Sequence, residues 1–198
     1  MRTIIILIIT SLPFFSFAQF GMNIGVKAGL NFTNVTNASE INAENRTGYM
    51  VGGYIAPKAK KNLGFRSELI LSRQGYDYKT STNTGNVNLD YLLLPQLLTI
   101  SFSKFVQLHL GAQAAILLNA KVDSSNGNGS GSLLDYFNRF DYGLVAGGEI
   151  FPFRKGLFVG ARINVSFNDV STGGNRPGFI PDVNAKNNVV QVYAGWRL

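Results

Sequence analysis

The sequence predicts an all-β fold: an eight-stranded antiparallel up-and-down transmembrane β-barrel with short periplasmic turns and long extracellular loops. Three observations support this prediction. Eight stretches of the chain alternate apolar and polar residues, these stretches are about nine residues or longer, and the connectors between them are short and long in turn. An even number of long strands, with tight turns at one rim and long polar loops at the other, is typical of barrels that cross an outer membrane.

The first residues predict export. Arg2 gives a short positive segment, residues 4–12 are almost entirely apolar, and a helix-breaking stretch ends in Ser16-Phe17-Ala18. Small residues at these positions suit signal peptidase. A run of about nine apolar residues is too short to cross a hydrocarbon core of about 30 Å as a helix. We therefore expect residues 1–18 to be a cleaved signal peptide and residues 19–198 to form one barrel domain in the cell outer membrane.

Eight strands are expected in order along the mature chain. Their predicted ranges are 21–31, 47–57, 63–78, 87–101, 105–119, 140–153, 157–169 and 188–198. Three connectors, at 58–62, 102–104 and 154–156, are short enough for hairpin turns. The other connectors are longer and rich in Asn, Ser, Gly and Thr, which is typical of exposed loops.

Period-two alternation separates two faces in most of these strands. In the fifth strand, Val106 and Leu108 lie on one face, while Gln107 and His109 lie on the other. The first, seventh and eighth strands repeat this pattern, whereas Pro95 and the apolar run before it blur the fourth. The polar face consists mostly of Gly, Asn, Gln and Ser, so we assign it to the lumen and the apolar face to lipid. A soluble lipocalin-like, ligand-binding barrel would reverse this arrangement and is an alternative.

Aromatic and basic residues both gather toward the expected membrane boundaries. The aromatic residues near strand ends are Tyr49, Tyr76, Tyr78, Tyr91, Tyr142 and Trp196, as expected for interfacial girdles. The basic residues of the short connectors are Lys58, Lys60, Lys61, Lys104, Arg154 and Lys155. Although the net charge is +7, these residues are not clustered on one helix or strand, so we do not expect nucleic-acid binding. Lysines in the turns suit anionic phospholipid headgroups.

Short motifs spread over the whole mature chain point to a family. They are Gly29-Leu30-Asn31, Glu68-Leu69 with Gln74-Gly75, Leu89-Asp90-Tyr91-Leu92 with Leu94-Pro95, Gly111, Asp141-Tyr142-Gly143 and Gly147. Together these motifs resemble the PorT-like outer-membrane β-barrel family. The resemblance implies an eight-stranded outer-membrane barrel with both termini in the periplasm, and the family's namesake is linked to a protein-secretion system. The chain departs from the family pattern by ending on Trp196-Arg197-Leu198 in place of a terminal Phe.

The polar faces of the strands place charged residues inside the barrel. These residues are Lys27, Arg66, Glu68, Asp141, Glu149, Arg162 and Arg197, and they are mixed in sign. One interpretation is a proton or ion path, and a small-solute channel is the corresponding function. The other is a lumen plugged by salt bridges, because the interior of an eight-stranded barrel is just wide enough for side chains and a buried charge needs a partner. We favour the second interpretation.

Catalysis and metal binding are not expected. His109 is the only histidine, it lies mid-strand on the lumen face, and no Ser or Asp stands two positions away on that face. A hydrolase needs a base beside its nucleophile, and a metal site of this kind needs several His or Cys ligands, whereas the chain has no cysteine. We therefore predict a non-enzymatic protein with no cofactor and no metal.

The longest connector, residues 120–139, carries apolar residues that a solvated loop has little reason to display. They are Leu133, Leu134, Tyr136 and Phe137. These side chains either form a contact surface for another protein, or fold back to cap the barrel mouth or extend the sixth strand. The sequence thus predicts a monomeric barrel in outer-membrane lipid that acts through loop or rim contacts with envelope or secretion proteins.

Overall fold

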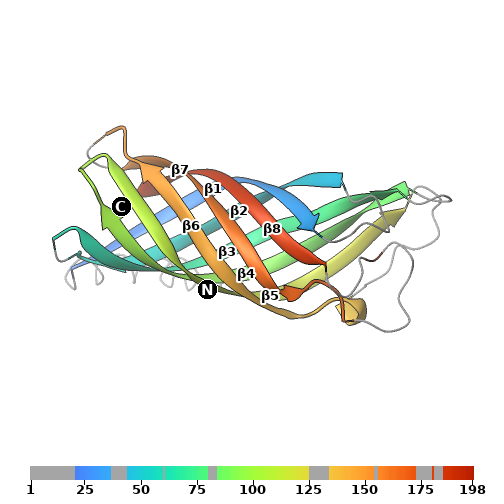
Figure 1. Ribbon diagram of the computed structural model, residues 1–198. Coiled ribbons are helices and arrows are strands. Elements are labelled where there is room, and N and C mark those ends of the chain that lie inside the picture. Colours follow the sequence, from blue (N-terminus) through green and yellow to red (C-terminus); the bar gives the residue numbers. More distant parts are fainter. Residues whose placement is uncertain are drawn as a thin grey trace, which may run out of the picture.

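Eight antiparallel strands close into a barrel in the computed structural model of the chain (Figure 1). The strands are β1 (Met22–Thr36), β2 (Glu44–Pro57), β3 (Leu63–Lys79), β4 (Thr84–Ser101), β5 (Val106–Ser124), β6 (Phe140–Ile150), β7 (Leu157–Asp169) and β8 (Lys186–Arg197). The structure describes residues 21–36, 44–59, 61–79, 84–124, 134–153, 156–172, 180 and 185–198, so the predicted signal peptide at 1–18 lies outside this part of the chain. No helix among the described residues is long and apolar enough to cross a membrane.

The predicted eight-stranded barrel is confirmed, and the strand ends differ mainly on one side. At the end of the barrel that carries the short turns, here the turn end, the predicted limits agree closely, except that β6 stops at Ile150. At the opposite, loop end, β1 continues to Thr36 and β5 to Ser124. Apolar alternation marks only the part of a strand that lies in lipid. Backbone hydrogen bonding needs no apolar side chain, so the ladder continues past the end of the pattern.

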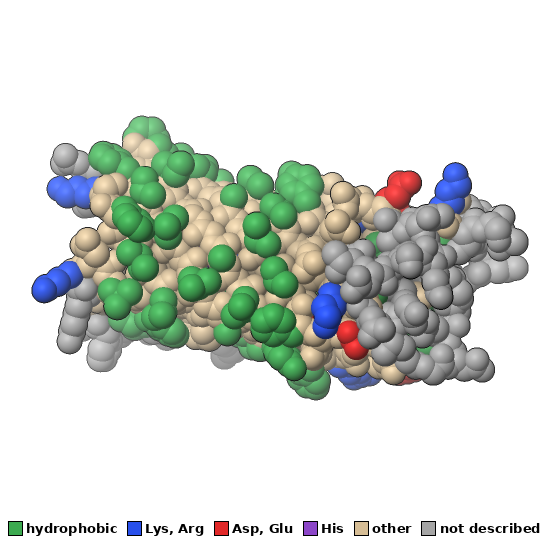
Figure 2. Space-filling view, in the orientation of Figure 1, with side chains coloured by type: hydrophobic (Ala, Val, Ile, Leu, Met, Phe, Trp, Pro, Cys, Tyr) green, Lys and Arg blue, Asp and Glu red, His purple; other side chains and the backbone are tan. Residues whose placement is uncertain are grey.

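Side chains alternate between an exposed apolar outer wall and a buried inner face. Figure 2 shows apolar side chains around the middle of the visible wall, with charged side chains gathered toward its two ends. Leu110 and Val192 are 61% and 49% exposed, whereas their neighbours His109 and Gln191 are buried. This alternation agrees with the predicted lumen and lipid faces.

The aromatic girdle was predicted only in part. Tyr49, Tyr142 and Trp196 lie on the outer wall and are about half exposed. The same prediction is wrong for Tyr76, Tyr78 and Tyr91, which are buried inside the barrel. The physical reason is parity. The even-numbered residues of β3 face the lumen, and in β4 the odd-numbered ones do, so nearness to a strand end does not decide which way a ring points.

The lumen is divided along its length. Its middle is polar, whereas at the loop end apolar side chains of β3, β4 and β5 form a cluster that includes Tyr76, Tyr78, Val87, Leu89, Leu117 and Val122. Phe137 belongs to this cluster, and the 3₁₀ helix η3 (Leu134–Tyr136) packs against it. The loop end is therefore closed by apolar contacts, and the middle of the barrel by polar ones.

The ring closes where β8 pairs with β1. The pairing runs from Gly25 opposite Arg197 to Thr36 opposite Lys186. At the turn end, where Figure 1 places the C-terminus, the Leu198 amide donates a hydrogen bond to the Ile24 carbonyl at 2.9 Å. The first and last strands are therefore joined along nearly their whole length.

Inward-facing glycines allow the backbones of neighbouring strands to approach closely. A Cβ atom built on Gly111 would lie 1.9 Å from the Gln96 carbonyl oxygen, and one on Gly143 would lie 2.1 Å from that of Val165. Because backbone cannot move aside as a side chain can, neither position accommodates a larger residue. Gly148 on the outer wall differs, since its added Cβ would meet the end of the flexible Leu108 side chain at 3.0 Å, while the nearest backbone atom, the Gln107 carbonyl oxygen, lies at an ordinary contact distance of 3.6 Å.

We expect Gly111→Ala to lower the free energy of unfolding by on the order of 2 kcal/mol, because the new methyl group overlaps the β4 backbone. Gly148→Ala is the matched control and should change it by less than about 0.5 kcal/mol. Urea titration in lipid vesicles, followed by the heat-dependent gel migration of the folded barrel, measures both variants. Equal effects would contradict the close-approach argument.

Candidate functional site in the barrel lumen

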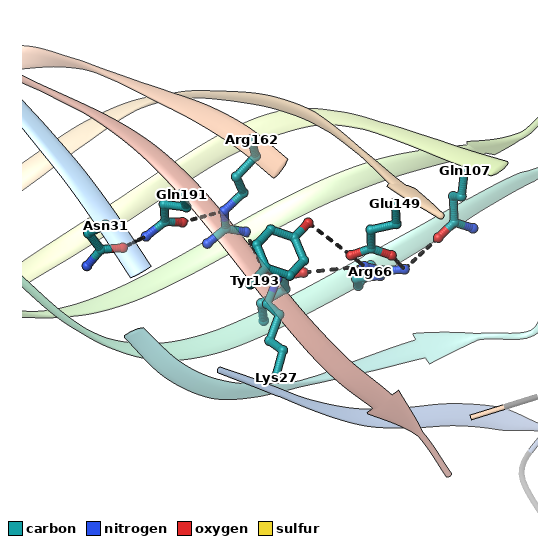
Figure 3. A network of polar contacts seen from close by, with 9 residues as sticks. Lys27, Asn31, Arg66, Gln107, Glu149, Arg162, Gln191 and Tyr193 are labelled. Carbon is teal, nitrogen blue, oxygen red and sulfur yellow. Dashed lines mark hydrogen bonds and ion pairs between the residues drawn. The ribbon is translucent and has the colours of Figure 1, made fainter. Parts of the chain in front are cut away.

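Five charged side chains from four strands meet in the middle of the lumen. They are Lys27 of β1, Arg66 and Glu68 of β3, Glu149 of β6 and Arg162 of β7, and all are buried. Each projects inward because it shares the parity of the lumen-facing residues of its strand. Figure 3 labels four of them, Lys27, Arg66, Glu149 and Arg162, within a network of polar contacts that includes neighbouring polar side chains. We call these five residues the lumen network.

Glu68 is the carboxylate that most of the lumen network contacts. Its Oε2 atom accepts hydrogen bonds from Lys27 Nζ at 2.7 Å and from Arg162 Nη1 at 2.6 Å. All three side chains are fully shielded from solvent. Two cations at bonding distance offset the cost of burying this carboxylate, and the carboxylate in turn holds them in place.

Glu149 forms the second centre. Arg66 binds it in a bidentate manner, with Nη1 donating to Oε1 at 2.7 Å and Nη2 to Oε2 at 2.9 Å. The Tyr193 hydroxyl also donates to Oε1, at 3.1 Å. Arg66 Nη1 lies 3.6 Å from Glu68 Oε1 and thereby connects the two centres. Planar, two-point pairing of this kind is both strong and geometrically specific.

Aromatic rings enclose the charges. The Arg66 guanidinium lies 4.3 Å from the centre of the Tyr54 ring, and Lys27 Nζ lies 4.4 Å from that of Tyr193. Tyr54 and Tyr193 each meet Phe158 edge to face, with ring centres 6.0 and 6.4 Å apart. The rings stabilise the cations through their π faces and fill the space beside them. The middle of the lumen is therefore occupied by side chains.

A chain of amides and hydroxyls extends the lumen network toward the loop end. Arg162 Nε donates to Gln191 Oε1 at 2.5 Å, and Gln191 Nε2 donates to Asn31 Oδ1 at 2.7 Å. From Asn31 the hydrogen bonds continue through Ser72, Gln74 and Asn187. Gln191 and Asn31 share the parity of the lumen-facing residues of β8 and β1. Their parity alone marked them as lumen residues.

Two of the seven charges predicted inside the lumen stand apart from the lumen network. Asp141 faces inward but accepts a hydrogen bond from Ser166 Oγ at 2.5 Å. The Arg197 guanidinium lies 4.3 Å from the centre of the Phe151 ring, near the turn end. His109 is also buried, and neither of its ring nitrogens has a hydrogen-bond partner among the described residues. The parity of these residues indicated an inward face but carried no information about their partners.

The lumen network has the chemistry of a structural plug. Three cations and two carboxylates meet at bonding distance, which leaves one positive charge in excess, and each carboxylate is engaged by at least one cation. Within the described part of the chain, no three His, Asp or Glu side chains lie close enough together to hold a metal ion.

The apolar segment of the long loop lies against the barrel mouth. Phe137 is only 1% exposed and forms a β-bridge with Ser171, while Leu134 and Tyr136 are partly buried against the apolar cluster. The Thr172 amide donates to the Tyr136 carbonyl at 3.0 Å. Leu133 lies outside the described residues. This placement favours the capping interpretation over a contact surface, since a buried Phe137 cannot meet a partner.

Comparison with known proteins places the barrel in context. The chain is similar in structure to the attachment invasion locus protein Ail of Yersinia pestis, with 16% identity, a TM-score of 0.51 and coverage of 89% of this chain and 98% of Ail. It is similar to OprG of Pseudomonas aeruginosa, with 13% identity, a TM-score of 0.52 and coverage of 89% and 95%. It is also similar to Neisserial surface protein A, with 14% identity, a TM-score of 0.52 and coverage of 90% of this chain and 97% of that protein. These identities show a shared fold only.

A search of curated protein sequences gives no match. A family model does match the sequence, over residues 17–172, and it describes an outer membrane protein β-barrel domain. The match covers most of the chain and agrees with the closed ring of strands and with its apolar outer wall. The chain therefore belongs to the outer membrane protein β-barrel domain family and resides in the cell outer membrane.

Proposed function

We propose that this protein is a non-enzymatic outer-membrane barrel with a plugged lumen, which acts through its loops or its turn rim on other components of the envelope. The observation that carries the proposal is the buried lumen network, which joins β1, β3, β6 and β7 across the interior. A lumen filled by paired charges and aromatic rings offers solutes no path, and both carboxylates of the lumen network are engaged by cations. Function then resides on the surfaces of the barrel.

Both alternatives drawn from the sequence are less compatible with this architecture. A small-solute channel needs an open lumen, whereas here the middle is occupied by side chains and Phe137 with its neighbours covers the loop end. A soluble lipocalin-like barrel would expose a polar wall, whereas this wall exposes Leu69, Leu110 and Ile163, each more than half accessible.

The motifs that resemble the PorT-like family make a component of a secretion system our preferred partner. The similar protein Ail is named for attachment and invasion, and one of its structures contains the heparin analogue sucrose octasulfate. By analogy, a small barrel of this shape can serve in binding at the cell surface. Which envelope component this chain contacts can be found by purifying the folded, affinity-tagged barrel from native membranes with whatever remains bound to it.

We expect the protein to show no discrete conductance steps in a planar lipid bilayer, because the lumen network blocks the lumen. Replacing Arg66, Glu149 and Phe137 together by Ala should produce steps, since this removes both partners of the bidentate pair in the middle of the lumen and the buried ring at its loop end. Val159→Thr on the outer wall is the control and should remain silent. Large, stable steps in the unaltered protein would overturn the plugged-lumen proposal.

If the lumen network is a structural plug, its two carboxylates should contribute unequally to stability. Glu68→Gln should lower the free energy of unfolding by about 3–5 kcal/mol, because Lys27 and Arg162 both lose their carboxylate partner. Glu149→Gln should cost less, since Arg66 keeps Gln107 at 2.5 Å and Glu68 at 3.6 Å. Denaturant unfolding in vesicles measures the difference. A larger loss of unfolding free energy for Glu149→Gln than for Glu68→Gln would contradict this prediction.

The loop segment can be tested for capping against partner binding. Replacing Leu134, Tyr136 and Phe137 by Ser should lower the free energy of unfolding by on the order of 3 kcal/mol, because a buried ring and its neighbours leave the apolar cluster. Asp135→Ser changes an exposed side chain of the same segment and serves as the control. Loss of a co-purifying protein at unchanged stability would instead identify these residues as the contact surface.

A further inference from the structure

A pair of polar side chains lies on the outer wall, within the apolar band. Gln96 of β4 is exposed, and its Nε2 atom donates a hydrogen bond to Ser67 Oγ of β3 at 2.9 Å. The two residues stand opposite each other in the ladder between these strands. Both have the parity of the outward-facing residues, so they belong to the lipid face rather than to the lumen network.

This pair lies at mid-height in the membrane. Within the apolar band, the outward residues of β4 are Leu92, Leu94, Gln96, Leu98 and Ile100, and those of β3 are Leu63, Phe65, Ser67, Leu69 and Leu71. Each polar residue is therefore the central one of five. The next outward residues toward the loop end, Asp90 and Arg73, form a partly exposed ion pair that marks the end of the band. A strand rises about 3.3 Å per residue and tilts by about 40°, which places Gln96 about 10 Å in height from the last apolar outward residue at either end of the band, Leu92 and Ile100.

The Gln96 amide is only partly satisfied there. A glutamine carries two N–H donors and one carbonyl acceptor. Within the described residues, the bond to Ser67 is the one hydrogen bond of this side chain, so one donor and the Oε1 acceptor have no protein partner. Lipid tails supply neither donors nor acceptors, and unsatisfied polar groups in hydrocarbon are costly. A polar side chain in such a place needs a partner from outside the barrel.

We propose that the face formed by β3 and β4 is the contact surface for a second copy of this chain. Two Gln96 amides related by a twofold axis along the membrane normal would each donate to the other's Oε1 atom. A symmetric contact uses the same patch on both copies, and the free donor and acceptor of one amide match those of its copy. Hydrogen bonds of this kind act as glue between transmembrane segments, for which hydrophobic burial provides no driving force.

The wall beside the polar pair is shaped for close approach. An apolar groove of about 1250 Å³ runs from Leu157 of β7 over β8, β1, β2 and β3 to the edge of β4, and Ser67, Leu69 and Leu94 line its β3–β4 side. Gly53 leaves a notch within it, since the nearest atom to an added Cβ is the Gly25 carbonyl oxygen at 3.2 Å. Acyl chains can fill such a groove but cannot bond the amide, which is why we assign this face to a second copy. A dimer departs from the monomer expected from the sequence.

Cross-linking of the purified, full chain in phospholipid vesicles tests the proposal. The sequence has no cysteine, so single cysteines can be placed freely. Leu98→Cys lies on the outer wall one outward position from Gln96, and Ala161→Cys lies on the outer wall of β7, away from the proposed contact. With a short bismaleimide, Leu98→Cys should form dimers several-fold more than Ala161→Cys. Adding Gln96→Leu should weaken dimerisation about tenfold, to the level of the control.

Two results would overturn the proposal. One is equal cross-linking from Leu98→Cys and Ala161→Cys. That result would mean that copies of the barrel meet only by random collision, so that the face formed by β3 and β4 contacts lipid or a different protein. The other is cross-linking at Leu98→Cys that Gln96→Leu leaves unchanged. Heat-dependent gel migration establishes that each variant is folded, and Gln96→Met replaces Gln96→Leu if that variant does not fold. Ser67→Ala frees one more amide donor and should retain the dimer.

Discussion

The ion pairs of Glu68 are the interaction on which the interior depends. Lys27 and Arg162, which bind one oxygen of this carboxylate, lie 41 and 94 positions from it in the sequence. Lys27 lies two strands from Glu68 in the sheet, whereas Arg162 of β7 reaches Glu68 of β3 across the interior because the ring closes. The same closure makes the lumen so narrow that bulk water cannot solvate a charge, so each charge must find a side chain on the opposite wall. The ion pairs that fill the lumen therefore form only when the barrel forms, because the strands of the wall supply both partners of each pair.

Much of this architecture could be predicted because a β-strand encodes its faces locally. Period-two alternation placed Lys27, Arg66, Glu68, Glu149 and Arg162 in the lumen without knowledge of their partners. The same rule, applied consistently to β3, would have turned Tyr76 and Tyr78 inward, since they share the parity of Glu68. Nearness to a strand end was the weaker signal, because aromatic residues serve both interfacial girdles and packed interiors.

Partners across the lumen could not be predicted, because alternation carries no information about what lies opposite. Arg66 and Glu68 share a face at a spacing of two, yet Arg66 binds Glu149 at 2.7 Å and approaches Glu68 only to 3.6 Å. That choice is set by strand tilt and register around the whole ring. The position of Phe137 was equally hidden, since its burial depends on a bridge to Ser171 in a different loop. The face on which a residue lies could be predicted from the local sequence, whereas its contacts across the lumen could not.

The pairing of β8 with β1 also dictates an order of events. Gln191 and Asn31, which continue the polar chain from Arg162, are 160 positions apart, and Tyr193 reaches Glu149 from the same closing strand. The hydrogen bonds that complete the interior are thus supplied by the last of the eight strands. Without β8 the sheet has two unpaired edges, which lipid cannot satisfy. Stable insertion of this barrel in the membrane therefore requires that β8 has paired with β1.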